Sequence, residues 1–434
     1  MNAAEVWIDA DFAPLKQVGV LEHDRGTVRF TYDPAWIDAP FGFALAPSLP
    51  LQRGAFYPPQ GMPLHGTLLD AAPDRWGQTL MDRREVLQAR AETRRVRALH
   101  AWDYLLGVHD ATRMGALRLR DPASGAFIAD DHPPAPPMAR LREIEAIALA
   151  ISRDAEAEGD AAAAWLSMLI APGSSLGGAR PKGCVTDTDG TQWLAKFPAA
   201  DDRHDIGAWE GVLNRLAAGC GITVPESRLL KFSRHHTFCA ARFDRTTDRR
   251  RHVASALTLL DRPVGAGGNY PELAELVSNL GAPGEVDANL EQLFRRTLFN
   301  VMTGNRDDHL RNHAFVRAAE GWRLSPAFDL TPSADKATHV FALDEADPTP
   351  RVETVLATHD YYRLTADQAL ELARQIATVV ATWPTEAATA GIGATGQAAM
   401  SPAFEAHTTW WTEGSGNWRP AARRGRAARL GRPV

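Results

Sequence analysis

Apolar and polar positions alternate near the start of the chain, and this pattern predicts a β-hairpin. Residues 16–23 and 27–32 flank the turn sequence Asp-Arg-Gly at 24–26. A period of two residues is typical of a strand with one buried face, and a glycine turn between two such runs is typical of a hairpin. Several prolines interrupt residues 47–63, after which apolar residues recur at helical spacing from Leu68 to Met81. The amino-terminal part is therefore predicted to be a small α+β unit.

A proline-rich run at residues 130–137 is the clearest linker in the chain. An amphipathic helical pattern begins soon after it, with apolar residues spaced from Leu141 to Ile151, so we place a domain boundary at this run. At the other end, residues 418–434 carry six arginines among alanines, glycines and prolines. Too few apolar residues are present there to offset the entropy of ordering, so we interpret this segment as a flexible tail. Contact with RNA, DNA or an acidic protein is the alternative.

Composition narrows the class of protein. The chain has 434 residues, 45% of them hydrophobic and 23% charged, which is typical of a globular protein with room for two or three domains. A formal net charge of −6 gives no general attraction to nucleic acid or to an anionic membrane. The three cysteines, Cys184, Cys220 and Cys239, form no Cys-x-x-Cys pair, which argues against a zinc site and fits a reducing compartment. Without a leader-like or membrane-spanning apolar run, we expect a cytoplasmic protein that does not enter the membrane.

A glycine-rich segment at residues 173–182 has the composition of a phosphate-binding loop. Its glycines let backbone amides approach phosphates, and Arg180 and Lys182 add positive charge. It is not a Walker A loop, because Pro181 separates the glycines from Lys182 and Gly183 follows. Taken alone, the segment is also compatible with a simple turn between strands.

The residues that follow suggest a place for a nucleotide. Lys196 lies among apolar neighbours in a predicted strand at 192–198, where a lysine is costly unless an anion meets it. A helix predicted over 205–218 places Glu210 where it can pair with Lys196, the alternative being a weak surface ion pair. The apolar run 237–245 is predicted to be a strand that leads into a hinge against which adenine packs, or else another buried strand.

The acidic and amide residues after a predicted helix at 290–302 are the strongest indication of a catalytic function in the sequence. The helix ends at Gly304, and the run Asn-Arg-Asp-Asp-His-Leu-Arg-Asn at 305–312 follows, answered by Asp329. Phosphoryl transfer from ATP requires an aspartate that deprotonates a hydroxyl and an asparagine and second aspartate that hold magnesium. Asp307, Asn312 and Asp329 have this order and spacing. A solvated turn is the alternative for the run alone.

Together these motifs resemble the HipA-like serine/threonine kinases, the toxins of type II toxin–antitoxin pairs. The matching pieces are residues 175–182, 194–198, 241–245, 307–312 and 325–329, with 46–51 and 68–77 similar to the family's amino-terminal domain. The sequence departs from the family at Ala241, where glutamate is frequent, and at Arg180-Pro181 in the glycine-rich loop. No histidine precedes Arg306 and no glycine follows Asp329.

The resemblance implies an α+β, two-lobed protein-kinase-like fold with a small amino-terminal α+β domain. We expect that domain over residues 1–130, the amino-terminal lobe over 139–245, the mainly helical carboxyl-terminal lobe over 246–410 and the basic tail over 411–434. The implied cofactors are ATP and Mg²⁺, with Asp307 as catalytic base and Asn312 and Asp329 as metal ligands. We expect His309 to tie the loop together rather than to ligate metal, because no cysteine or second histidine lies at ligand spacing, and we count it among the nucleotide-binding residues. The implied nucleotide-binding residues are Ser175, Gly177, Gly178, Ala179, Lys182, Lys196, Ala241, Phe243, His309, Asn312 and Asp329.

The resemblance also implies partners and a form of self-regulation. Ser175, with Ser174 as a second acceptor, corresponds to the family's autophosphorylation site, and a phosphate there would draw the loop out of the nucleotide pocket. Known toxic members phosphorylate aminoacyl-tRNA synthetases, and a HipB-type helix-turn-helix antitoxin binds both the kinase and operator DNA. Because no helix-turn-helix pattern is evident in this chain, DNA contact is expected only through such an antitoxin. Two alternatives remain, a catalytically silent binding module or co-repressor and a small-molecule phosphotransferase.

Overall fold

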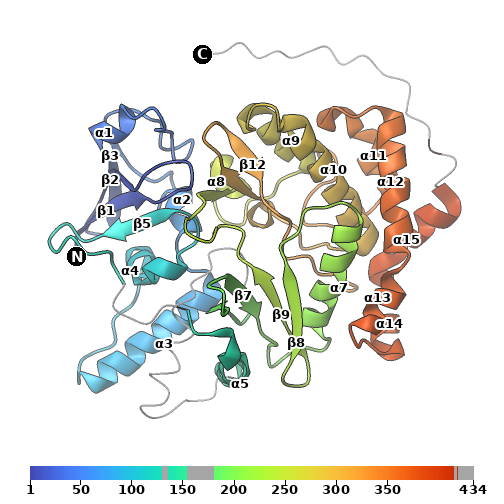
Figure 1. Cartoon of the computed structure of the whole chain (residues 1–434), viewed down its shortest axis with the longest axis horizontal. Helices are drawn as coiled ribbons and strands as arrows, with labels where there is room; N and C mark the ends of the chain where they lie inside the picture. The colour runs from blue at the N-terminus through green and yellow to red at the C-terminus, as the bar shows by residue number, and fades with distance from the viewer. Residues whose placement is uncertain (130–134, 154–179, 415–417, 419–434) are drawn as a thin grey trace.

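Three antiparallel sheets organise the chain in the computed structural model, which describes residues 1–129, 135–153, 180–414 and 418. The strand orders are β4-β3-β2-β1-β5, β6-β7-β9-β8 and β10-β11-β12. Figure 1 shows the blue amino-terminal sheet on one side, the orange carboxyl-terminal helices on the other and the green strands of the second sheet between them. Residues 173–179 of the predicted glycine-rich loop and most of the predicted tail lie outside the described residues.

The first sheet contains the predicted hairpin. Strands β2 (Lys16–Asp24) and β3 (Thr27–Tyr32) pair from Gly19 opposite Tyr32 to Asp24 opposite Thr27. Gly26 has a φ of +87°, which a glycine adopts without strain, so the prediction from alternation and turn residues is confirmed. The remaining members are β1 (Ala3–Ile8), β4 (Ala55–Phe56) and β5 (Leu117–Arg120), and the short helix α1 (Pro34–Ile37) follows β3.

The helical pattern predicted from Leu68 onward forms two helices rather than one. Helix α2 (Gly66–Asp70) ends before Pro73, and α3 (Arg75–Ala91) begins at Asp74, whose side chain accepts a hydrogen bond from the Gly77 amide. The break is expected because proline cannot donate within a helix and disfavours helical geometry in the residue before it. Helix α4 (Ala101–Gly107) follows.

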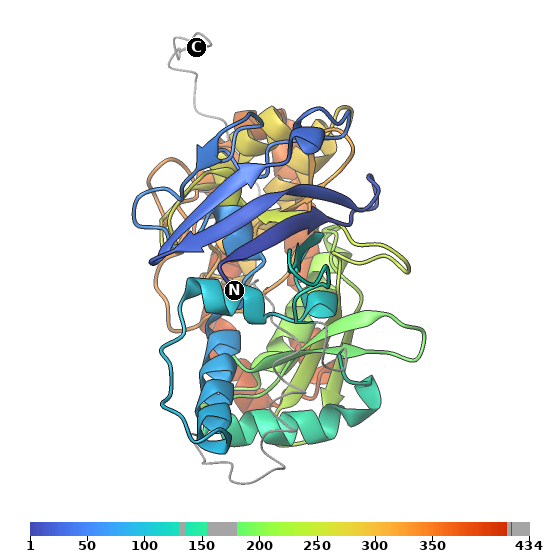
Figure 2. The same ribbon diagram turned by 90° about the vertical axis from the view of Figure 1, so that its left-hand side faces the viewer.

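Helix α3 packs against the second sheet rather than only against its own domain. Its residues Trp76 and Leu80 share a buried cluster with Ile144 of α5 (Leu141–Ser152) and Trp193 of β7 (Gln192–Lys196). Figure 2 shows α3 beside α5 below the amino-terminal sheet. The amphipathic pattern that predicted α5 is confirmed, because Ile144, Ile147, Ala148 and Ile151 are buried.

The second sheet also contains β6 (Lys182–Thr186), β8 (Ser227–Lys231) and β9 (His236–Ala241). Helix α7 (Ile206–Gly219) packs against β8 and β9, and it begins at Asp205, whose carboxylate accepts a hydrogen bond from the Ala208 amide. The predicted strand at Lys196 and the predicted helix that carries Glu210 are both confirmed. The three cysteines are buried and form no disulfide, as expected.

The carboxyl-terminal part is mainly helical and is built around α10 (Val286–Thr303). This helix ends at Gly304, whose φ of +64° forms the left-handed cap that the sequence predicted. The third sheet consists of β10 (Val253–Ser255), β11 (Ala314–Arg317) and β12 (Trp322–Leu324). The other helices are α8 (Ala256–Leu259), α9 (Tyr270–Leu280), α11 (Val352–Ala357), α12 (Ala366–Val380), α13 (Trp383–Thr389), α14 (Ala394–Met400) and α15 (Glu405–Thr409).

None of the helices in the described part of the chain combines the length and the apolar character that crossing a membrane requires.

Candidate active site

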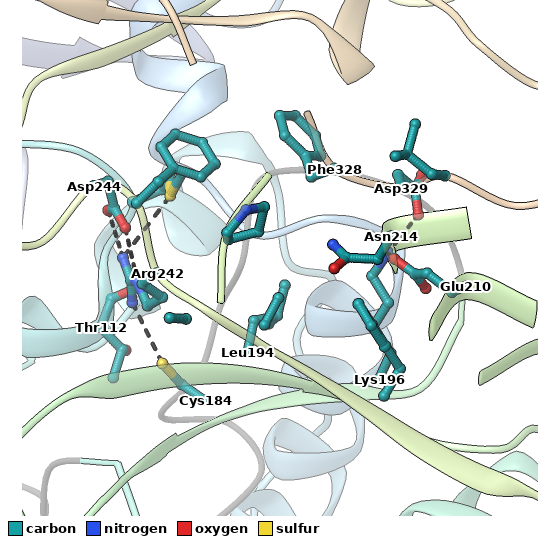
Figure 3. Close-up of a pocket in the computed structure, with 17 residues that line it drawn as sticks. Thr112, Cys184, Leu194, Lys196, Glu210, Asn214, Arg242, Asp244, Phe328 and Asp329 are labelled. Atoms are coloured by element: carbon teal, nitrogen blue, oxygen red, sulfur yellow. Dashed lines mark hydrogen bonds and ion pairs between the residues drawn. The ribbon is translucent and has the colours of Figure 1, made fainter. Parts of the chain in front are cut away.

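A pocket lies between the second sheet, helix α7 and the segment around Asp329 (Figure 3). Its empty space, including the part open to solvent, is about 780 Å³, which is within the range of small-molecule sites. Charged side chains lie at both ends, Lys196, Glu210 and Asp329 at one and Arg242 and Asp244 at the other, and the walls between them are mainly apolar. The lining residues include Leu194, Lys196, Glu210, Ala241, Phe243 and Asp329.

Strand β7 directs Lys196 into this pocket because side chains alternate along a strand. Trp193 and Ala195 belong to the buried cluster with α3 and α5, whereas Leu194 and Lys196 line the pocket on the opposite face. The Lys196 ammonium lies 2.5 Å from Oε1 of Glu210 and 2.6 Å from Oδ1 of Asp329. The predicted pairing with Glu210 is confirmed, and this pair is buried rather than on the surface.

The pKa values of these three groups depend on the charges beside them. Burial lowers the pKa of Lys196, but attraction to Asp329 and Glu210 outweighs burial and holds the pKa above its usual value. Burial raises the pKa of Glu210, and the nearby Asp329 charge adds to that rise while Lys196 opposes it. Burial also acts to raise the pKa of Asp329, yet Lys196 reverses the shift and lowers that pKa to about 2. Asp329 is therefore ionised at neutral pH, as a metal ligand must be.

Asp329 is held in an unusual backbone conformation. Its φ of +59° lies in the left-handed region, which costs a non-glycine residue about 1 kcal/mol or more. Such strain persists only where the surrounding structure fixes the residue, and here the Lys196 ion pair supplies that restraint.

The loop after α10 separates the two neighbouring aspartates into different roles. Asp308 is buried, and its carboxylate accepts hydrogen bonds from the Tyr270 hydroxyl at 2.5 Å and the Asn300 amide at 2.9 Å. His313 Nε2 lies 2.8 Å from the same oxygen. The Asp307 side chain is 61% exposed and forms an ion pair with Lys336. Asp308 thus anchors the loop, while the Asp307 side chain lies at the surface.

Asn312 has the features of a metal ligand. A hairpin of β11 and β12 connects the loop to the Asp329 segment, and the Ser325 amide donates to the Ala314 carbonyl at 2.9 Å. The start of β11 and the end of β12 lie at the same end of this hairpin. Asn312, just before β11, and Asp329, shortly after β12, are therefore both at that end. The side chain of Asn312 is buried, and its Oδ1 has no hydrogen-bond partner among the described residues. An unpartnered amide oxygen at the same end of the hairpin as an ionised carboxylate suits Mg²⁺, which prefers oxygen ligands.

His309 lies close enough to Asp329 to help lower the pKa of that carboxyl. Its predicted contact with a nucleotide stays a prediction. Its Nδ1 is buried and has no hydrogen-bond partner in the part of the chain that the structure describes.

Lys182 lies opposite Lys196 in the sheet, and its charge helps to lower the pKa of Asp329. Its ammonium lies 2.6 Å from Oδ2 of Asp74, and both side chains are 3% exposed. The predicted contact of Lys182 with a nucleotide stays a prediction. Five predicted residues of the glycine-rich loop lie outside the described residues, namely Ser174, Ser175, Gly177, Gly178 and Ala179.

The other end of the pocket is lined by the segment after β9. Ala241 and Phe243 line it as predicted for an adenine site, but the Ala241 amide already donates to the Glu226 carbonyl at 2.8 Å. The Phe243 ring stacks on Phe328 with centroids 5.6 Å apart, so Phe328 is a wall residue that the sequence did not reveal. Thr112 and Met114 of the amino-terminal domain also line the pocket, and no local signal in the sequence marks them.

Comparison with known proteins places the chain in a family. The model described as "HipA-like C-terminal domain" matches residues 174–383, and the model described as "HipA N-terminal domain" matches residues 5–120. These two regions make up most of the chain and occur in the family's order. The protein belongs to the HipA family, and the resemblance inferred from its motifs is confirmed.

A curated relative is the serine/threonine-protein kinase toxin HipA of Shewanella oneidensis strain MR-1. It is 28% identical over 147 residues, and the match covers 29% of this chain and 34% of the relative. The matched part thus spans about a third of the relative's length.

A chain of the solved complex of the Shewanella oneidensis MR-1 toxin–antitoxin system HipA, HipB and its operator DNA matches with a TM-score of 0.65 and 19% identity. It covers 94% of this chain and 97% of that chain, which confirms the predicted kinase-like α+β fold with its added amino-terminal domain. The Helicobacter pylori proinflammatory kinase CtkA matches with a TM-score of only 0.32 at 12% identity, over 52% of this chain and 94% of that chain.

Proposed function

We propose that the protein is an ATP- and Mg²⁺-dependent serine/threonine protein kinase. The observation that carries this proposal is the shared ammonium of Lys196, which joins Glu210 of α7 to Asp329 at one end of a pocket with mainly apolar walls. A lysine held by a helical glutamate is the arrangement that positions ATP phosphates in protein kinases.

Each polar group then has a task in phosphoryl transfer. Lys196 attracts the phosphates, and Phe243 and Phe328 offer flat surfaces for the base. Asp307 accepts the proton of the acceptor hydroxyl while the hydroxyl oxygen forms its bond to the γ-phosphorus and the bond to the bridging oxygen of ADP breaks. Asn312 and Asp329 hold Mg²⁺, which neutralises charge on the phosphates.

The exposure of Asp307 favours a polypeptide acceptor over a small molecule. Its side chain is 61% exposed, and an accessible base can reach a hydroxyl on a large partner without a closed substrate cavity. The complete set of Lys196, Asp307, Asn312 and Asp329 argues against a silent binding module, which would not need the costly buried ion pair of Lys196 with Glu210.

We further propose that the protein acts in the cytoplasm as the toxin of a type II toxin–antitoxin pair. Membership in the HipA family and the toxin name of the Shewanella oneidensis relative support this role. The proposed partners are a HipB-type antitoxin, through which DNA would be contacted, and a protein substrate such as an aminoacyl-tRNA synthetase. The solved complex of HipA, HipB and operator DNA supports the antitoxin as a partner. Autophosphorylation at Ser175 or Ser174 is proposed as the means of self-inactivation.

Labelled ATP tests the activity directly. Purified wild-type protein and the Asp307→Asn variant are incubated with [γ-³²P]ATP and Mg²⁺, and phosphoproteomics of cells that express each form identifies the acceptor. Only the wild type should add phosphate to serine or threonine. Label that appears on a small molecule instead would favour the phosphotransferase, and a growth effect that survives Asp307→Asn without any transfer would favour the binding module.

A further inference from the structure

The nucleotide pocket is built from two domains at the end that faces away from Lys196. Thr112 and Met114 come from the segment between α4 and β5 of the amino-terminal domain, and both line the pocket. Figure 3 shows Thr112, Arg242 and Asp244 at one end and Lys196, Glu210 and Asp329 at the other. Arg242 and Asp244 neutralise each other. Because the phosphates belong with the Lys196 ammonium, the base of a nucleotide belongs at the end with Thr112 and Met114.

Arg242 fixes this segment to the second sheet. Its guanidinium donates to the Thr112 carbonyl at 2.7 Å and to the Arg113 carbonyl at 3.2 Å, and it contacts the Met114 sulfur at 3.8 Å. Arg242 directly follows β9. Its bonds therefore fix the position of the amino-terminal segment relative to the strand that lines the pocket.

A buried carboxylate completes the connection. Asp244 is fully buried, and it accepts hydrogen bonds from the Gly115 amide at 2.8 Å and from Arg242 and Arg245 at 2.6 Å each. Burial acts to raise the pKa of Asp244, but the two guanidinium groups outweigh it and hold the pKa far below its usual value. Arg245 in turn donates to the Arg113 carbonyl at 2.6 Å. We call this set of bonds the Arg242–Asp244 joint. It holds the backbone rigidly, because any movement that separated the buried charges from their partners would be costly.

We propose that Met114, positioned by the Arg242–Asp244 joint, is a wall of the base site and contacts the purine of the bound nucleoside triphosphate. A thioether is polarisable and packs well at the edge of an aromatic ring, and Met114 faces the same cavity as the stacked rings of Phe243 and Phe328. The base site is then complete only while the amino-terminal domain is docked. This inference rests on the proposed use of ATP.

The test compares binding of a whole nucleotide with binding of its phosphates alone. Dissociation constants for Mg-ATP and Mg-tripolyphosphate are measured by calorimetry on the full chain as wild type, Met114→Glu, Met114→Ala and Met114→Leu. Met62→Glu, at a half-buried position of the same domain outside the pocket, is the matched control. Lys196→Met serves as the variant that removes phosphate binding, and thermal melting shows which variants are folded.

The inference predicts a selective loss. Met114→Glu should raise the Kd for Mg-ATP by about tenfold or more, because it buries an unpaired carboxylate against the base, and should change the Kd for tripolyphosphate less than about twofold. Met114→Leu should stay within about threefold of wild type and Met114→Ala should weaken ATP binding by about threefold, since only packing changes. Met62→Glu should match wild type.

Two results overturn the inference in distinguishable ways. In the first, wild type binds ATP and Lys196→Met does not, while both Met114→Glu and Met114→Ala bind ATP like wild type. Met114 then does not contact the base, and the kinase proposal stands. The same holds if folded Met114→Glu loses ATP and tripolyphosphate equally. If the wild type binds neither ligand, the proposed function fails and the inference fails with it.

Discussion

Lys196 and Asp329 are 133 positions apart in the chain, yet the lysine ammonium lies 2.6 Å from the aspartate carboxylate. One residue is on strand β7 and the other follows the hairpin of β11 and β12. The same ammonium lies 2.5 Å from Glu210, so a single cation balances two carboxylates. Its removal would leave Glu210 and Asp329 facing one another without compensation.

Lys196→Met is therefore expected to abolish phosphoryl transfer and to lower the free energy of unfolding by about 3 kcal/mol. Urea denaturation followed by circular dichroism measures the stability. The double variant Lys196→Met with Glu210→Gln should recover part of the lost stability but none of the activity, because the repulsion is relieved while the phosphate-binding charge stays absent. Equal stability of the single variant and wild type would contradict the role of the ion pair.

The neighbouring residues Asp307 and Asp308 provide a matched pair of substitutions. Asp307→Asn should lower kcat by about 10²–10⁴-fold and leave unfolding and ATP affinity unchanged, since the exposed carboxylate acts only as a base. Asp308→Asn should instead lower the free energy of unfolding by about 2 kcal/mol, because it disturbs buried bonds to Tyr270, Asn300 and His313. Single-turnover kinetics and denaturation of both variants give the comparison. The opposite pattern would reassign the base to Asp308.

Magnesium dependence tests Asn312 and Asp329. Asn312→Ala is expected to raise the Mg²⁺ concentration for half-maximal activity by about tenfold or more. Removal of an oxygen ligand should lower the affinity for Mg²⁺ at least as much as removal of a residue that only hydrogen-bonds a ligand. Asn289→Ala is the control, because the Asn289 side chain bonds the Leu324 amide and the Glu285 carbonyl. An unchanged Mg²⁺ requirement in Asn312→Ala would remove this residue from the metal site.

Two buried histidines predict how stability depends on pH. Burial lowers the pKa of His252 to about 3 and that of His339 to about 4, and both ring nitrogens of His252 lack a partner among the described residues. Unfolded histidine has a pKa near 6.5, so below that pH the unfolded chain binds more protons than the folded chain. The protein should lose stability as pH falls from about 6.5 toward 4, by about 1.4 kcal/mol per pH unit for each histidine.

His252→Phe should reduce that slope by about 1.4 kcal/mol per pH unit, whereas His204→Phe at a half-exposed position should leave it close to wild type. Urea denaturation at several pH values from 4 to 7 provides the slopes. If His252→Phe kept the slope of the wild type, the histidine would not be neutral in the folded protein.

Local patterns were enough to predict much of the fold and part of the site. The hairpin at 16–32, helices α5 and α10 and the pairing of Lys196 with Glu210 all follow from alternation, helical spacing and cap residues. Each of these depends on residues close in sequence or on one strand and the next helix, where periodicity carries the information.

Contacts between distant segments were not predictable in this way. The sequence pattern named Asp307 as the base but did not show that Asp308 anchors the loop, because adjacent loop residues share no periodic signal and Asp308 bonds to Tyr270 of α9 and Asn300 of α10. Met114 likewise reaches the pocket only because Arg242 and Asp244 dock its segment beside β9. Such contacts depend on how the domains pack.

A crystal structure of the protein with Mn²⁺ and a non-hydrolysable ATP analogue tests the central claim most directly. The account predicts an anomalous Mn²⁺ peak between Oδ1 of Asn312 and the Asp329 carboxylate, the γ-phosphate within reach of Asp307, and the base between Phe243, Phe328 and Met114. A nucleotide bound elsewhere, or a metal that contacts neither Asn312 nor Asp329, would contradict it.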